Sequence, residues 1–367
     1  MKSPRKTPSL SDIAALTGLT KSAVSLALRH DPRIPKTTRQ RVEKAAKRVG
    51  YRRNAVVAHL MSQLRIGEQR DDRATIALLN LNEDPSAFRS HPTIPAYVRG
   101  CRSRAAALGY ILDEINEPAT SLDGERLLRI LQARGLRGCI LTGLMKSNRL
   151  PSTLAPLWTA MPCVVTGVRT EDPRLPFACA DHHAVAQLAL SRTLGTGRRR
   201  PSLVLERGID ELVQGRFTAG VLIAQRALPA RDRIPPFYHE GSDSKPSRKF
   251  ISWWDRYRPD AILTLYHVVE DWLKALHVKV PETTALVQLE SRPERSDWAG
   301  VDQHNDRTGA AAVDLLVQMI HAGESALSTS PRAMLIEPTW IEGSTLPVRS
   351  ANPFHHGMTF KNGKGQV

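Results

Sequence analysis

Residues 9–28 of the chain read SLSDIAALTGLTKSAVSLAL, and this stretch carries the clearest structural signals of the N-terminal part. Ser9 and Asp12 have the spacing of a helix start, where a side-chain oxygen caps free N–H groups and an acidic residue faces the positive end of the helix. Gly18 then interrupts the apolar periodicity with the residue that most readily takes a left-handed turn. Thr20 can cap the segment that follows. The stretch therefore predicts two short helices joined by a glycine turn.

A third helix is expected from about Lys36 to Val49, with a basic outer face. Two helices joined through a glycine turn and followed by a third form the layout of a helix-turn-helix domain. In such a domain the second helix, here expected from Lys21 to Arg29, enters the major groove by its N-terminal residues. These residues are Lys21, Ser22 and Ser25. Lysine can reach guanine O6 or N7, and serine can bind bases or phosphates.

The positive charge of the chain is concentrated in this N-terminal segment. The net charge is +16, and residues 1–66 carry 15 Lys and Arg against 3 Asp and Glu, whereas the remaining residues carry 37 against 33. A folded and strongly basic module is the electrostatic signature of polyanion binding. A solubilising arm is the alternative, which the predicted helices argue against. The segment therefore predicts double-stranded DNA as a partner.

The composition argues against several other classes of protein. The chain is 41% hydrophobic and 24% charged, which is typical of a folded protein, and no apolar run of about 18 residues predicts a membrane span. The basic start Met1–Lys6 is followed by no apolar stretch, so we expect no secretory signal and a cytoplasmic, nucleoid-associated protein. The four cysteines lack C-x-x-C spacing and are expected to be buried or free thiols.

From about Ala74 onward, short apolar runs alternate with helical stretches, which is typical of parallel sheets with right-handed crossovers. This part is large for one sheet and suits two, with ligands bound beyond the carboxyl ends of the strands. The predicted strands are Thr75–Leu79, Tyr110–Asp113, Gly138–Leu141, Cys163–Thr166, Ser202–Leu205, Ala261–Leu265 and Ala285–Leu289. The predicted helices are Tyr97–Leu108, Ser121–Arg134, His183–Leu194, Arg216–Ala227, Val268–His277 and Thr308–Ala322.

Residues 9–60, from the stretch quoted above through Thr38–Val42 and Gly50–Ala55, resemble the DNA-binding head of the LacI/GalR family of bacterial transcription regulators. The resemblance implies that Asn54 starts a short hinge helix that folds on operator DNA, and that Leu60 inserts into the minor groove and kinks a base step. For Leu60 the alternative is a core or dimer contact. The DNA-binding residues expected on these grounds are Ser9, Thr20, Lys21, Ser22, Ser25, Leu26, Arg29, Asn54, Ala58 and Leu60.

The head departs from the family pattern at two positions. Leu26 stands where the family usually has arginine, and Arg53 stands where it usually has proline. Leucine can touch a thymine methyl group but cannot read guanine, so we expect an operator half-site that differs from the common one. The linker up to Arg73 is also longer than usual and charged.

The resemblance extends more loosely over residues 74–346 to the periplasmic-binding-protein-like sensor of the same family. It is carried by segments 134–141, 179–183, 259–262, 300–311 and 335–345. Tyr266-His267 stands where the family often has an Asn-Asp pair that binds sugar hydroxyls, so simple hexose binding is not expected. The candidate effector-binding residues are His91, Asp181, Arg216, Tyr266, His267 and Gln303.

Several of these residues have a purely structural alternative. Asp181 precedes a predicted helix and can be its cap. Arg216 can form a surface ion pair that contributes little. His267 can be a half-buried histidine with its hydrogen bonds satisfied, and Gln303 a support between strands.

The sequence thus predicts an N-terminal all-α helix-turn-helix head with a hinge helix, followed by a two-lobed α/β sensor. The expected divisions are residues 1–51 for the head, 52–73 for hinge and linker, 74–346 for the sensor and 347–367 for a disordered tail. The expected function is a ligand-responsive repressor that binds a pseudo-palindromic operator as a homodimer, with a small-molecule effector and no membrane partner. No G-x-S-x-G, H-E-x-x-H or P-loop motif is present, so neither an enzyme nor a cofactor or metal is expected. A solute-binding protein would share the sensor fold but not the basic head.

Overall fold

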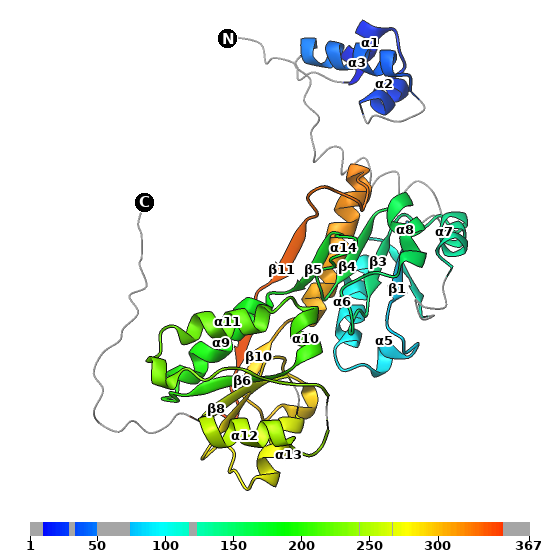
Figure 1. Cartoon of the computed structure of the whole chain (residues 1–367). Coiled ribbons are helices and arrows are strands. Elements are labelled where there is room, and N and C mark those ends of the chain that lie inside the picture. Colours follow the sequence, from blue (N-terminus) through cyan, green and yellow to red (C-terminus); the bar gives the residue numbers. More distant parts are fainter. Residues whose placement is uncertain are drawn as a thin grey trace, which may run out of the picture. The chain divides into compact units, whose positions relative to one another are not determined.

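The computed structural model describes residues 10–28, 34–49, 74–116, 123–241, 243–265 and 267–347 (Figure 1). The chain divides into two compact units, Met1–Asp72 and Arg73–Val367, and each is described by itself. The side chain of Ser22 and six further predicted site residues lie outside the described part. These residues are Ser9, Arg29, Asn54, Ala58, Leu60 and Tyr266. The expected hinge and linker, residues 52–73, also lie outside the described part. So does the expected tail from residue 348 onward.

The head is a three-helix module, as the sequence predicts. Its helices are α1 (Leu10–Thr17), α2 (Lys21–Ala27) and α3 (Lys36–Val49). Gly18 takes a left-handed φ of 65°, and the hydroxyl of Thr20 caps α2 by accepting a hydrogen bond from the Ala23 N–H at 3.2 Å. A small apolar core joins the three helices through Ile13, Val24, Ala27, Val42 and Ala46.

The first lobe of the larger unit is built on a parallel sheet. Its strand order is β11-β5-β4-β3-β1-β2, and every pair in it is parallel. The strands are β1 (Thr75–Asn80), β2 (Ile111–Ile115), β3 (Cys139–Thr142), β4 (Cys163–Thr166), β5 (Phe177–Ala180) and β11 (Ala333–Ile336). The helices are α5 (Ala87–Ser90), α6 (Ile94–Ala107), α7 (Gly124–Ala133), α8 (Ala155–Ala160) and α14 (Asn305–Ala322).

The second lobe repeats this plan with one antiparallel pair, β10 with β12. Its strand order is β12-β10-β9-β8-β6-β7. The strands are β6 (Pro201–Glu206), β7 (Phe237–His239), β8 (Ala261–Thr264), β9 (Ala285–Gln288), β10 (Gly300–Asp302) and β12 (Thr339–Ile341). The helices are α9 (His182–Gly195), α10 (Arg207–Leu212), α11 (Arg216–Gln225), α12 (Arg248–Tyr257) and α13 (Val268–Ala275).

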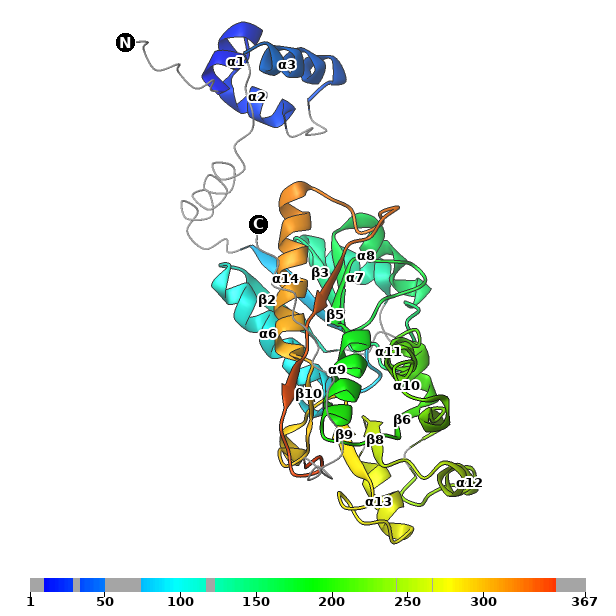
Figure 2. The same ribbon diagram turned by 90° about the vertical axis from the view of Figure 1, so that its left-hand side faces the viewer.

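The chain passes between the lobes three times, after β5, after β10 and after β11. Helix α14 therefore follows a second-lobe strand but packs in the first lobe, against α6 and along the sheet, as both views show (Figures 1 and 2). Leu212 of the second-lobe helix α10 packs into the core of the first lobe. The crossings place the carboxyl ends of β9 and β10 next to first-lobe segments.

The predicted strands and helices of the larger unit are confirmed as elements, with ends shifted by a few residues. Apolar runs alone did not predict β5, β7, β10, β11 and β12, each three or four residues long. Helix α12 was also missed. This helix buries Phe250, Trp253 and Trp254 against the second-lobe sheet. Its sequence is rich in aromatic residues, which have a low helix propensity.

The four cysteines are all buried free thiols, as expected. Among the helices of the described residues, none combines the length and the apolar character that crossing a bilayer requires.

Candidate DNA-binding head and effector site

The predicted DNA-contacting residues lie at the start of α2. Lys21 is the first residue of the helix and is exposed, and Thr20 is exposed at the cap position. Because the Thr20 oxygen already accepts a hydrogen bond, its proton remains available for a phosphate. Ser25 and Leu26 are half-buried one turn further on. The glycine turn and the cap thus present Lys21 at the tip of the second helix.

Helix α3 adds a basic surface to the head. Arg41, Lys44, Lys47 and Arg48 are exposed on it, on the side opposite the buried Val42. Exposed cations attract a polyanion without reading its sequence, and that attraction weakens with salt. The head therefore combines a candidate base-reading residue with a surface suited to the DNA backbone.

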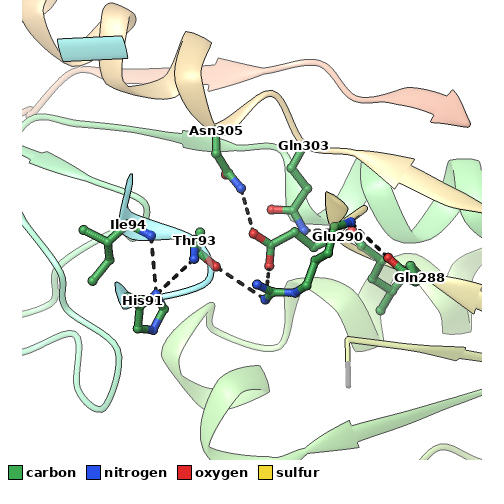
Figure 3. Close-up of polar contacts among 9 residues, drawn as sticks. His91, Thr93, Ile94, Gln288, Glu290, Gln303 and Asn305 are labelled. Carbon is green, nitrogen blue, oxygen red and sulfur yellow. Dashed lines mark hydrogen bonds and ion pairs between the residues drawn. The ribbon is translucent and has the colours of Figure 1, made fainter. Parts of the chain in front are cut away.

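A polar cluster joins the two lobes in the larger unit (Figure 3). We name it the inter-lobe cluster. It consists of His91, Thr93, Glu290, Arg292, Gln303 and Asn305.

Glu290 is the centre of this cluster. Its carboxylate accepts hydrogen bonds from Arg292 Nη2 at 2.9 Å and from Asn305 Nδ2 at 2.7 Å. The side chain of Glu290 is 10% exposed and that of Arg292 15%, so the pair is largely desolvated. Arg292 Nη2 also makes a long contact of 3.5 Å to the Thr93 hydroxyl of the first lobe. The amide of Gln303 donates to the Leu289 carbonyl at 2.8 Å and so supports the loop that carries Glu290.

His91 contacts the segment that carries Thr93. Its Nδ1 accepts from the backbone N–H groups of Thr93 at 3.1 Å and Ile94 at 3.4 Å, which places the ring proton on Nε2. Burial lowers the pKa of His91, and the Arg292 guanidinium lowers it further. At neutral pH the ring is therefore an uncharged hydrogen-bond donor.

Two atoms of the inter-lobe cluster and one atom of His267 are buried and have no hydrogen-bond partner among the described residues. They are Arg292 Nη1, Asn305 Oδ1 and His267 Nε2. Burial, then Arg295 and Arg292, lower the pKa of His267, so its ring lies within the field of the same arginine. Unsatisfied buried polar atoms cost about 1–3 kcal/mol each, and a group of them is typical of a site for a polar ligand. This group favours the inter-lobe cluster as the effector site.

The other predicted effector residues lie elsewhere. Asp181 caps α9 by accepting from the N–H groups of His183 at 3.1 Å and Ala184 at 3.2 Å, which is the structural alternative stated above. Arg216, at the start of α11, lines a different pocket together with Arg169 and Arg174. Of the six candidates, the structure thus brings His91 and Gln303 into one cluster and His267 beside it.

Sequence patterns did not single out Glu290 and Arg292. They also missed a second polar network, which joins helices α10 and α11 to strand β7. There the Thr218 hydroxyl contacts both the Asp210 carboxylate and the Tyr238 hydroxyl at 2.6 Å. Asp210 is 8% exposed. A carboxylate that directly follows a predicted strand was the available signal for Glu290.

Buried His182 makes the larger unit sensitive to acid. Burial, followed by the Arg216 charge, lowers the pKa of this histidine to about 4 from its usual 6.5. Since the unfolded chain binds the proton more tightly, the stabilisation is complete above about pH 6.5 and is lost as the pH falls towards 4. We expect a loss of about 2 kcal/mol between about pH 7 and pH 5 from this group. Thermal unfolding measured over this pH range should show a weaker acid dependence for His182→Gln than for the wild type.

Within the described ranges, His, Cys, Asp and Glu side chains nowhere gather in threes as a metal site would require. The site geometry instead defines a class of protein, namely a basic helix-turn-helix head ahead of a two-lobed α/β unit with a polar cluster between its lobes.

Comparisons with known proteins agree with this class. Residues 9–54 match the family model described as bacterial regulatory proteins, lacI family. No curated protein sequence matches the chain.

Three solved structures illustrate the likeness in fold. The transcriptional regulator CelR in complex with cellobiose is 20% identical, with a TM-score of 0.54 over 92% of this chain and 99% of that one. The Lac repressor dimer bound to operator and the anti-inducer ONPF is 16% identical, with a TM-score of 0.55 over 93% and 100%. The transcription regulator CcpA of Lactococcus lactis is 13% identical, with a TM-score of 0.54 over 74% and 98%. The chain therefore carries a LacI-type DNA-binding domain ahead of a unit with the fold of ligand-responsive transcriptional regulators.

Proposed function

We propose that the chain is a transcriptional repressor that binds a pseudo-palindromic operator as a homodimer and responds to a small polar molecule at the inter-lobe cluster. The observation that carries the DNA-binding part is the folded basic head, with Lys21 exposed at the tip of its second helix and a match to the lacI-family model. A single head offers few base contacts, and a two-fold dimer doubles them. Acting on the chromosome, such a protein works in the cytoplasm. We propose no catalytic activity for this protein.

The effector would act through the two lobes. The inter-lobe cluster takes His91 and Thr93 from the first lobe and Glu290 and Arg292 from the second. A ligand that binds these groups in one lobe arrangement better than in another shifts the equilibrium by that difference in affinity. CelR, which shares the fold, is solved with cellobiose. We infer a ligand with several hydrogen-bonding groups, since the cluster offers both donors and acceptors.

Selection of bound duplexes from a random DNA pool by the full-length protein tests the proposal. At near-physiological salt, where nonspecific binding is suppressed, an enriched pseudo-palindrome is expected. Binding that enriches no sequence and fades smoothly with salt would contradict it. A monomer that still binds the selected palindrome tightly would contradict the homodimer.

Substitution of the exposed Lys21 tests the assignment of the base-reading residue. If Lys21 reads a guanine, Lys21→Ala should weaken operator binding by about 1–3 kcal/mol and relax the preference at one base pair. Equilibrium binding to the selected duplex and to single-base variants of it measures both effects. The control is Lys47→Ala, which removes the same charge from the exposed face of α3. Equal losses on all duplexes would show that Lys21 contacts phosphate only.

A further inference from the structure

Three arginines converge on a small pocket in the larger unit. Arg169 and Arg174 come from the segment between β4 and β5, and Arg216 comes from the start of α11 in the other lobe. The pocket has a volume of about 160 Å³, and no acidic residue lines it. No residue of the inter-lobe cluster lines it either. The pocket therefore belongs to neither site described above.

The three guanidinium groups form no hydrogen bond or ion pair within the described part of the chain. The neighbouring carboxylates Glu171 and Asp172 pair with Arg149 at 3.8 and 3.7 Å and make no ion pair with the three guanidinium groups. Glu171 also accepts from Gln214 at 3.1 Å. An arginine stays charged at any physiological pH, so three of them around one pocket repel one another until an anion enters.

The shape of the pocket narrows the class of anion. Ligands of drug size need cavities of about 300–1,000 Å³, so a pocket of about 160 Å³ suits a small oxyanion or the charged end of a larger molecule. Three guanidinium forks exceed what a single carboxylate can pair with, but they match the several oxygens and double charge of a phosphate.

The rest of the lining is apolar. Leu175 and Phe177 are 1% and 5% exposed, and Leu335 of β11 adds an apolar side chain that is 42% exposed. Such a wall favours an organic phosphate with a small apolar group over the free ion, because apolar contact adds to the charge pairing. The hydroxyl of Thr170 accepts from the Leu175 N–H at 3.2 Å and retains its proton for a phosphate oxygen.

We propose that this pocket, held by Arg169, Arg174 and Arg216, is a second small-molecule site that binds a phosphate monoester. Since its arginines come from both lobes, an occupied pocket ties the segment between β4 and β5 to the start of α11. A phosphate ligand would thus act on the same lobe arrangement as an effector at the inter-lobe cluster, but from a separate place.

Calorimetric titration of the full-length protein with phenyl phosphate, inorganic phosphate and benzoate tests the proposal, at constant ionic strength and without DNA. Saturable binding of one phenyl phosphate per chain is expected, with inorganic phosphate weaker and benzoate weakest. The double variant R169Q/R174Q should bind phenyl phosphate about tenfold more weakly or worse, since it loses charge-assisted hydrogen bonds. Its melting temperature should stay near that of the wild type, because Arg174 is exposed and Arg169 half-buried.

The double variant R192Q/R199Q is the matched control, since it removes two exposed arginine charges from the same unit and neither residue lines the pocket. It should bind phenyl phosphate as the wild type does. Equal weakening in R192Q/R199Q would show a general charge effect and overturn the proposal, as would a lack of saturable binding of phenyl phosphate. Phosphates held by the basic head would give binding that R169Q/R174Q leaves unchanged, which also overturns it. Because no DNA is present, none of these outcomes depends on the proposed regulator function.

Discussion

The Gly100→Ala variant is expected to lose about 3 kcal/mol or more of stability in the larger unit. A Cβ atom at Gly100 of α6 would lie 1.8 Å from the backbone carbonyl oxygen of Asp306 in α14, far inside any real contact. The partner position is equally tight, because a Cβ at Gly309 would lie 2.1 Å from the carbonyl oxygen of Tyr97. The two helices therefore touch backbone to backbone, and one methyl group must push them apart.

The sign of this effect is set by the clash and not by helix propensity. Alanine in place of glycine inside a helix normally stabilises by about 1 kcal/mol. Gly195→Ala is the matched control, since that glycine ends α9 and its Cβ would meet nothing within 4 Å. Thermal unfolding should show a lower melting temperature for Gly100→Ala and an unchanged or higher one for Gly195→Ala. Equal melting temperatures would show that the helices do not cross as closely as described.

The same variant should also disturb the candidate effector site. Helix α14 begins at Asn305, whose amide donates to Glu290 at 2.7 Å. A displaced α14 moves that donor, while Glu290 and Arg292 stay with the segment after β9. We therefore expect effector response to fall in Gly100→Ala protein that is still folded.

Glu290→Leu is expected to lose about 3 kcal/mol, because it leaves the largely buried Arg292 charge without its carboxylate. It also removes the acceptor of the Asn305 amide. The double variant Glu290→Leu/Arg292→Met should recover most of this loss, since replacing a whole buried ion pair by apolar residues is often neutral or stabilising. Urea unfolding of the two single variants and the double variant measures the coupling between the two positions.

An exposed ion pair provides the control for this prediction. Glu83 and Lys146 are 65% and 77% exposed, and Glu83→Leu should change stability by less than about 1 kcal/mol. If the double variant proved as unstable as Glu290→Leu alone, an uncompensated Arg292 charge would not be the cause. The loss would then come from the Asn305 contact or from packing.

Much of the head and the element order could be predicted from the sequence, because the signals are local. Gly18 and Thr20 mark helix ends through a dihedral angle and a hydrogen bond that involve only residues within a few positions of each. Apolar runs such as Thr75–Leu79 mark buried strands of a parallel sheet for the same reason. The reading of Asp181 as a helix cap is equally local, and the structure shows that contact.

The sites between the lobes depend on residues that are far apart in the chain. Arg292 meets Thr93 across 199 positions, and Arg169 shares a pocket with Leu335. No periodicity or capping pattern encodes such a meeting, since it arises only when three crossings bring two sheets together. The sequence pointed to Gln303 through a family resemblance, but not to Glu290 or Arg292.

Local signals in the sequence predict the three-helix basic head, its LacI-type DNA-binding character and the alternation of strands and helices, because caps, periodicity and charge act over short distances. The tertiary structure alone shows that Glu290 and Arg292 pair next to Thr93, that α6 and α14 touch at Gly100, and that three arginines share one pocket. Those contacts follow from how the two sheets and their crossings are packed, which no short stretch of the chain specifies.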